Sequence, residues 1–198
     1  MKSSLKTIIY FIAFLSYCYA ERLKLKQADV LESKRIGFEI VKILEGNIEF
    51  QKGNIELKCQ NSIYKEKKDI AYLYDNVKMN KEDINLTCDS ITFFSKNNKL
   101  ESTGSPIIQD TEYRLTANKL IYFTDLDSGI AVGNVELLQN NQRIKADKIE
   151  YRKKSNAVSY LATGNVKIID SLRTATCGLA SYDASNEKTV LDLKPKII

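Results

Sequence analysis

The stretch Gly133–Tyr151, GNVELLQNNQRIKADKIEY, decides the fold of this 198-residue chain, because copies of it recur at a nearly fixed interval. Its opening, Gly133-Asn134-Val135, has counterparts at five other places. These begin at Gly46, Asp75, Gly104, Gly164 and, in degraded form, Lys194, so the steps are 29, 29, 29, 31 and 30 residues. A period of this length is typical of proteins in which each repeat buries its apolar face against its neighbours.

Within each copy, apolar and polar residues alternate, and a period of two is that of a β-strand. In the central copy the apolar positions include Val135 and Leu137 and, after a polar turn, Ile144. The alternation changes parity before Ile149, which a strand does only at a kink or an extra residue. We therefore predict an all-β chain, elongated, open and antiparallel, of six repeats of about 29 to 31 residues with a corner in each. Two sheets should face each other over a narrow apolar slot.

One column of the repeat coincides with this corner. It holds mostly residues whose side chains bond their own backbone in turns. The six residues are Asp29, Gln60, Asp89, Asn118, Asp147 and Gly178. An acid/base pair of Asp89 and Asp147 is the weaker interpretation, because an active site is normally a single constellation and these carboxylates recur as a ladder. Pro106 stands in the valine column of its repeat and lacks a backbone donor, so it predicts a bulge there.

The first 20 residues have the features of a secretory signal peptide. Two lysines precede an apolar run from Ile8 to Leu15, and the stretch ends in Cys18-Tyr19-Ala20. The run is shorter than the roughly 20 apolar residues of a membrane-spanning helix. Cleavage after Ala20 is the simplest interpretation, and an uncleaved anchor or acylation of Cys18 are the alternatives. We divide the chain into a signal peptide (1–20), a short lead (21–27) and a single domain (28–198).

The charge balance does not favour nucleic acid as a partner. Without the signal peptide the chain carries 28 basic and 25 acidic side chains, a net charge of +3. Basic residues gather in the predicted hairpin tips among acidic ones, where we expect them to be solvated and to discourage edge pairing. They are Lys65, Lys67, Lys68, Lys96, Lys99, Arg152, Lys153 and Lys154.

The sequence favours neither a catalytic nor a metal site. It has no histidine, which removes the commonest general base, and no C-x-x-C pair or Gly-rich phosphate loop. Cys59, Cys88 and Cys177 stand in a column that other copies fill with Ala117 and Ala146, so we expect small buried apolar side chains. A bridge between Cys59 and Cys88 stays open. We predict no catalytic residues, no metal and no cofactor.

These repeats resemble the OstA-like family, and within it most closely the periplasmic lipopolysaccharide transport proteins of the LptA type. The resemblance rests on GNIEFQ from Gly46 and GNVELLQ from Gly133, and on IKADKIEY followed about a dozen residues later by LATGNV. It covers Ala28 to Ile198. It implies a twisted β-jelly roll with an apolar groove, placed in the periplasm, that carries lipopolysaccharide from the inner to the outer membrane through the acyl chains of lipid A. No bond is made or broken in that task, so we do not expect an enzyme.

The groove candidates are the inward apolar residues of the repeats. They are Ile48, Phe50, Leu57, Val77, Met79, Leu86, Ile91, Phe93, Leu115, Leu120, Tyr122, Val135, Leu137, Ile144, Ile149, Tyr151, Val166 and Ile168. For any one of them, a filled core is the plainer interpretation.

The two end strands of such a structure leave backbone groups unpaired, and these can take up a strand of another chain. The edge candidates are Ala28, Val30, Val190, Leu191, Leu193 and Ile197. The resemblance implies an LptC-like protein at the N-terminal edge and an LptD-like outer-membrane protein at the C-terminal edge. A head-to-tail homo-oligomer is compatible with the same edges.

Three alternatives remain. One is an LptC-like member of the same pathway that keeps its signal as an anchor. Another is a polymerising structural β-solenoid with a solid interior, in which Phe93, Tyr122 and Tyr151 pack against the opposite sheet. The last is a polysaccharide-active β-helix enzyme, which ranks lowest because no inward carboxylate pair exists outside the corner column.

Overall fold

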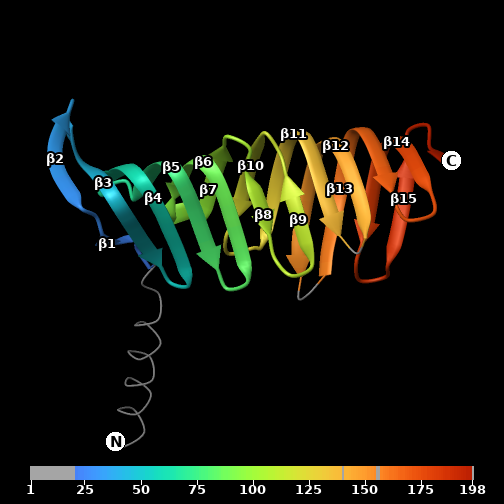
Figure 1. Ribbon diagram of the computed structural model, residues 1–198, viewed down its shortest axis with the longest axis horizontal. Helices are drawn as coiled ribbons and strands as arrows, with labels where there is room; N and C mark the ends of the chain where they lie inside the picture. Colours follow the sequence, from blue (N-terminus) through green and yellow to red (C-terminus); the bar gives the residue numbers. More distant parts are fainter. Residues whose placement is uncertain (1–20, 140, 155–156, 198) are drawn as a thin grey trace, which may run out of the picture.

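The computed structural model describes residues 21–139, 141–154 and 157–197, which form one continuous ladder of antiparallel strands along a single long axis (Figure 1). The strands are β1 (Lys24–Gln27), β2 (Val30–Ile36), β3 (Glu39–Lys52), β4 (Ile55–Lys65), β5 (Ile70–Lys81), β6 (Ile84–Phe94), β7 (Lys99–Thr103), β8 (Ile107–Gln109), β9 (Tyr113–Thr116), β10 (Lys119–Phe123), β11 (Ser128–Gln139), β12 (Gln142–Lys154), β13 (Ala157–Ile169), β14 (Thr174–Asp183), β15 (Lys188–Asp192) and β16 (Lys196–Ile197). The described part has one short 3₁₀ helix, η1 (Ser95–Asn97), and no helix there is long and apolar enough to cross a membrane. The predicted signal peptide, residues 1–20, lies outside the described residues.

The ladder folds along its length into two sheets, because most strands serve both. Residues 128–132 of β11 pair with β10, and residues 136–139 of the same strand pair with β9. We call sheet I the half that contains β2, β7, β10 and β15, and sheet II the half that contains β1, β8, β9 and β16. The predicted elongated antiparallel β-jelly roll is therefore confirmed, and the lead at residues 21–27 contributes the strand β1.

A two-residue bulge makes the corner of each repeat. In β13, Gly164 and Asn165 have φ angles of 75° and 46°, and the register to β14 shifts between Thr163 and Val166. Left-handed backbone of this kind is populated readily by Gly and, among other residues, mainly by Asn and Asp. The same pair of left-handed residues begins at Gly46, Asp75, Gly104, Gly133 and Leu193. The corner is where the parity change predicted it.

The corner column works differently from our expectation. The side chain of Asp147 does not close a turn on its own backbone; its Oδ2 accepts a hydrogen bond from Asn165 Nδ2 of the next strand at 2.9 Å. Asp29 accepts in the same way from Asn47 at 2.8 Å. Each acidic side chain thus lies over the glycine of the next bulge and staples two strands at the corner.

The repeat around Pro106 departs from the others. There strand pairing is interrupted between β7 and β8, across Gly104–Pro106, and again between β9 and β10. Two short strands therefore stand where the other repeats have one long strand. The carbonyl of Pro106 still accepts from the backbone amide of Ala117 at 3.3 Å. The missing donor of proline shortens the strands at this corner without separating the sheets.

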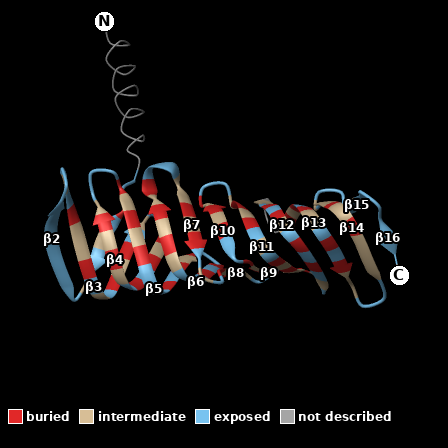
Figure 2. Cartoon of the chain, turned by 90° about the horizontal axis from the view of Figure 1, so that it is seen from above, coloured by how far each residue is buried: buried red, intermediate tan, exposed pale blue. Residues whose placement is uncertain are grey.

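The core runs continuously between the two sheets, as the alternating buried and exposed bands of Figure 2 show. Its residues come from every repeat, and the aliphatic and aromatic side chains at the centre are almost fully buried. Cys59 and Cys177 are buried, as their column predicts, whereas Cys88 is only half-buried. All three thiols are free.

The bulge predicts a graded response to Gly→Ala substitution. A Cβ at Gly164 would collide with the Asp147 carboxylate, whereas a Cβ at Gly37 (φ 61°), in the turn before β3, would meet no atom within 4 Å. We expect Gly37→Ala to lower the free energy of unfolding by about 1 kcal/mol from the left-handed backbone alone. Gly164→Ala should cost about 2 to 4 kcal/mol, because strain and overlap add. Urea unfolding measures both, and equal losses at the two sites would contradict the corner assignment.

Candidate functional site: the slot between the sheets and its seam

The predicted groove residues all lie in the slot between the two sheets. Each of the 18 is buried in one continuous apolar cluster, and Ile168, the most exposed of them, retains 9% of its accessible surface. The structure therefore brings them together along the whole length of the molecule.

Side chains from the two sheets touch across the slot. The rings of Phe50 and Tyr64 meet edge to face with centroids 5.3 Å apart, and those of Tyr113 and Tyr151 lie 6.0 Å apart. Phe93 and Tyr122 are fully buried in the same layer. The slot is filled in this structure, so a ligand could enter only if the sheets moved apart.

The long sides of the slot are closed in two different ways. On one side, the bulges carry the backbone from sheet to sheet. On the other, the hairpin tips of sheet I face those of sheet II, and we call this line the seam. Side chains bridge it: the Tyr64 hydroxyl in sheet I lies 3.0 Å from the carbonyl oxygen of Leu23, beside β1 of sheet II.

Lysines close the middle of the seam. Lys52, at the end of β3 in sheet II, donates to the Ser95 carbonyl and to the Asn98 side chain at the opposite tip. One repeat further on, Lys81 Nζ lies 2.6 Å from both the Thr124 carbonyl oxygen and Asp127 Oδ1. The ammonium groups thus lie against oxygen atoms, as a buried lysine requires.

Their electrostatics follow from burial and partners. Burial lowers the pKa of Lys52. Burial acts to raise the pKa of Asp127, but hydrogen bonds from Lys81 and from the Tyr122 hydroxyl, 2.7 Å away, outweigh it and hold that pKa below its ordinary value. Lys81, Asp127 and Tyr122 therefore form a charged cluster at the mouth of an apolar slot.

A third lysine, Lys153, also bridges the seam, and its position corrects a prediction. We expected Lys153 at a solvated hairpin tip, but its side chain is only 11% exposed and lies between Asp110 Oδ2 at 2.6 Å and Asp83 Oδ2 at 3.3 Å. Burial acts to lower its pKa, but the hydrogen bonds to Asp110 and Asp83 and the negative charges of both together outweigh this and leave the pKa raised. Here sheet I supplies the cation and sheet II the anions. Lys52, Lys81 and Lys153 are called the latch lysines below.

The latch residues were not predicted, although the repeat contains a signal for them. Lys52, Lys81, Asp110 and Gln139 each stand six residues after the first residue of their bulge, which places them at the end of a sheet II strand. A polar residue that recurs at the mouth of an apolar slot needs a partner across it. That reasoning would have found the column, but not the partners on the other sheet.

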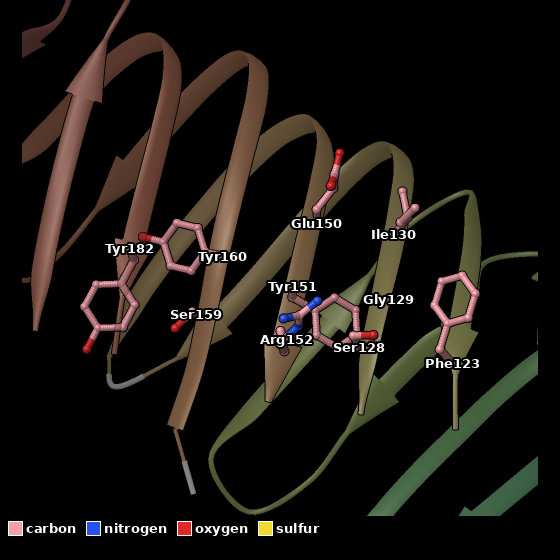
Figure 3. Close-up of a pocket in the computed structure, with 10 residues that line it drawn as sticks. All are labelled: Phe123, Ser128, Gly129, Ile130, Glu150, Tyr151, Arg152, Ser159, Tyr160 and Tyr182. Carbon is pink, nitrogen blue, oxygen red and sulfur yellow. The ribbon is translucent and has the colours of Figure 1, made fainter. Parts of the chain in front are cut away.

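A depression of about 410 Å³ lies along the tyrosine row of sheet I in the C-terminal half (Figure 3). Tyr160 and Tyr182 stack there with centroids 5.6 Å apart, and Tyr151 packs against Gly129, which leaves no room for a side chain. The carboxylate in its lining, Glu150, is paired with Lys148 at 2.6 Å. The depression thus offers surface, and no pair of carboxylates for acid/base work.

The acidic and cysteine side chains of the described residues form neither a metal site nor a nucleophilic site. In the described part of the chain, no three Asp, Glu or Cys side chains are grouped to hold a metal. Burial raises the pKa of Cys59 and of Cys88 to about 12, so both thiols are protonated at neutral pH and poor nucleophiles.

The edge candidates lie on the outermost strands. Val30 belongs to β2, which pairs only with β3 among the described residues, and Ala28 precedes it. Val190 and Leu191 belong to β15 and Ile197 to β16, and within the described part of the chain both strands pair with β14 alone. Leu193 lies in the degraded bulge between them, with φ 58°.

The N-terminal edge is larger and more apolar than predicted. Beyond Val30, four further apolar side chains are exposed on β2, on the start of β3 and in the turn between them. They are Leu31, Ile36, Phe38 and Ile40. Phe38 is fully exposed at the hairpin tip, and its signal in the sequence was an aromatic residue next to Gly37 in a turn.

Comparison with known proteins agrees with this architecture. The profile of OstA-like proteins matches residues 65–197, two thirds of the chain. The chain belongs to the OstA-like family. No curated protein matches the sequence. The OstA-like repeat predicted from the sequence is thereby confirmed as a family assignment.

Among solved structures, the fold is similar to that of LptH from Pseudomonas aeruginosa, the LptA-homologous periplasmic component of the lipopolysaccharide transport device. The TM-score is 0.53 at 14% identity, and the match covers 58% of this OstA-like chain and 93% of LptH. At that identity the likeness establishes the fold. The OstA-like β-jelly roll is therefore longer here than the part it shares with LptH.

The latches predict a stability difference between buried and surface lysines. Lys81→Met keeps the apolar stem, but the Thr124 carbonyl loses that donor and Asp127 loses its cationic partner and keeps only the Tyr122 hydroxyl. We therefore expect the free energy of unfolding to fall by about 1 to 3 kcal/mol at pH 7. Lys58→Met is the matched control, because Lys58 pairs with Glu56 on the open surface and should give no measurable loss. Urea unfolding compares them.

Acid should reduce the Lys81→Met effect. Because the folded pKa of Asp127 is depressed, its contribution is present at neutral pH and is lost as pH falls through that folded pKa. The gap between the parent and Lys81→Met should therefore shrink below about pH 4. A gap independent of pH would show that the loss comes from packing alone.

Proposed function

We propose that this protein is a periplasmic carrier of lipopolysaccharide, which holds the acyl chains of lipid A in the slot and passes them from the inner to the outer membrane. The observation that carries the proposal is the continuous apolar interior, which runs the length of a β-jelly roll and is closed along one side by side-chain latches. Membership of the OstA-like family and the fold shared with a lipopolysaccharide transport component support it.

The physical reason for such a slot is the cost of moving acyl chains through water. Exposed apolar surface costs about 25 cal/mol per Å², so several chains cannot cross an aqueous compartment unshielded. A slot lined from end to end by side chains such as Phe50, Leu137 and Ile168 replaces water along the path. The task needs no bond chemistry, so we propose a binding protein and not an enzyme.

The localisation and domain division belong to the same proposal. Residues 1–20 would direct export and be removed, and residues 28–198 would form one domain, to which the lead at residues 21–27 adds β1. The LptC-like alternative differs in that the signal stays as an anchor. Sizing the exported protein by mass spectrometry separates the two, because only cleavage after Ala20 gives a mature chain that begins at Glu21.

We further propose that the two free edges meet different partners. The N-terminal edge would take up a strand of an LptC-like protein and the C-terminal edge a strand of an LptD-like protein. Copies joined head to tail would use the same two surfaces, because the edges differ and the contact is heterologous. The apolar residues of β2 and the adjoining turn would then be covered.

A second candidate function, a polymerising structural scaffold with a solid interior, is favoured by one observation. The ring contacts Phe50–Tyr64 and Tyr113–Tyr151 join the two sheets directly, as the scaffold requires. The same contacts fit a carrier seen without its cargo. Direct detection of lipid in the slot separates the two.

Photocrosslinking in the producing cells tests the carrier proposal. A light-activated amino acid at Leu137, fully buried in the slot, should give an adduct with lipopolysaccharide. Leu138 is the matched control, because it is the neighbouring leucine on the outer face of the same strand and should give none. Lipid adducts at neither position, in protein that is exported and folded, would favour the scaffold.

The edge proposal has its own test. Deleting residues 190–198 removes most of β15 and all of β16, and should abolish self-association and capture by an outer-membrane partner. Lipid crosslinking at Leu137 should survive, because that position lies two repeats away. Unchanged oligomer size in analytical ultracentrifugation, at concentrations where the parent associates, would refute assembly through this edge.

A further inference from the structure

Polar atoms without partners collect at one place inside the slot. Among the described residues, six buried side-chain oxygen atoms have no hydrogen-bond partner. Four of them belong to neighbouring residues in the C-terminal half: Tyr113, Gln139, Tyr151 and Tyr160. Each such atom costs about 1 to 3 kcal/mol, and native proteins keep few of them, so a cluster of four needs an explanation.

The four residues form one contiguous group that spans both sheets. Tyr113 and Gln139 are register partners in sheet II, and Tyr151 and Tyr160 are register partners in sheet I. The rings of Tyr113 and Tyr151 lie 6.0 Å apart across the slot. Gln139 Nε2 reaches across the seam to the Val158 carbonyl at 3.5 Å, and its Oε1 is buried without a partner.

The repeat shows that these polar groups are departures from an apolar pattern. The position of Tyr113, opposite the latch column in sheet II, is filled by Ile55 and Ile84 in earlier repeats. Each repeat has an aromatic residue in sheet I whose register partner lies on the next strand. That partner is Ala71, Leu100 or Gly129 in the earlier repeats and Tyr160 in this one. The fold does not require hydroxyl groups at either place, because other repeats close without them.

Other tyrosines of the same row are satisfied. The hydroxyls of Tyr64 and Tyr122 lie 3.0 and 2.7 Å from carboxylate oxygens of Asp69 and Asp127, in each case five residues further on. For Tyr151 that position is residue 156, outside the described residues. We therefore build the site on Tyr113, Gln139 and Tyr160, with the Tyr151 ring next to both tyrosines.

We infer that this tyrosine–glutamine cluster is a polar binding site within the slot that selects acyl chains carrying a hydroxyl group. The inference rests on the proposed lipid-binding function. A chain hydroxyl can accept from one tyrosine while it donates to Gln139 Oε1, so it satisfies a donor and an acceptor at once. A plain hydrocarbon chain leaves all of these groups unpaired.

The site lies where the molecule is hollowed at its surface. A depression of about 690 Å³ over the sheet II tips includes Tyr113 and Gln139 in its lining, and the one of about 410 Å³ in Figure 3 includes Tyr160. The cluster therefore lies beside the seam, within reach of a chain that enters between the tips. The cluster borders the Lys153 latch, because Asp110, which pairs with Lys153, also accepts a hydrogen bond from the Tyr113 backbone amide at 2.9 Å.

The test compares two fatty acids that differ by one hydroxyl, tetradecanoic acid and 3-hydroxytetradecanoic acid, by displacement of a fluorescent fatty acid from the purified protein. The parent should bind the hydroxylated acid about fivefold to tenfold more tightly, as one or two net hydrogen bonds predict. Tyr113→Phe and Tyr160→Phe should each reduce this preference to about twofold or less, while binding of tetradecanoic acid stays unchanged.

Thermal unfolding without ligand gives a second readout. Because the Tyr113 and Tyr160 hydroxyls are unpaired, Tyr113→Phe and Tyr160→Phe should leave the melting temperature unchanged or raise it. Tyr64→Phe and Tyr122→Phe are the matched controls: they lose hydrogen bonds to Asp69 and Asp127, so their melting temperature should fall while the preference for the hydroxylated acid is kept. This pattern would support the site.

Three outcomes would overturn the inference. Equal binding of both acids by the parent removes the hydroxyl site and leaves the lipid slot standing. A fall in melting temperature for Tyr113→Phe and Tyr160→Phe as large as in the controls would show that their hydroxyls already have partners, such as enclosed water. Failure of the parent to bind either acid would instead tell against the proposed lipid slot itself, and the site would fall with it.

Discussion

The left-handed residue pair at each corner is the constraint on which this structure depends. A β-strand cannot change faces without an extra residue, and here two consecutive residues with positive φ, as at Gly164 and Asn165, turn the strand from one sheet into the other. Glycine keeps the first position clear for the acidic side chain of the preceding strand, and asparagine bonds that side chain. This corner recurs every 29 to 31 residues, and the repeated corners hold the two sheets together along the whole length of the slot.

The two sides of the slot therefore differ in what it takes to open them. At the corners the backbone itself passes between the sheets, so separation there would break strands. At the seam the contacts described above run through side chains, chiefly the ammonium groups of the latch lysines on carbonyl and carboxylate oxygens. Such oxygens can be exchanged for water when the sheets part, because both partners are polar. The fold thus has a fixed side and a side that can yield.

The sequence predicts more of the fold than of the site, for a physical reason. Period-two alternation and the parity change at Ile149 are local, and they predicted the strands, the corners and the 18 buried slot residues. The latches are pairs across two sheets, so the partner of Lys81 depends on how tips 43 residues apart meet. Charge alone predicted Lys153 on the surface, and this was wrong, because two carboxylates of sheet II enclose it. Unpaired hydroxyls, such as that of Tyr160, are visible only once every neighbour is placed.

The unequal edges bear on how such a molecule would work in series. Both edges combine exposed apolar side chains with charges: β2 exposes Val30, Leu31 and Ile36 beside Glu32, Lys34 and Arg35, and the C-terminal edge exposes Val190, Leu193 and Ile197 beside Lys194 and Lys196. Such apolar surface gains from being covered. Because the two edges differ in sequence, a contact between them is heterologous and gives a row of molecules one direction. In such a row the slots would lie end to end, which is the arrangement that the proposed transfer of an acyl chain from one molecule to the next requires.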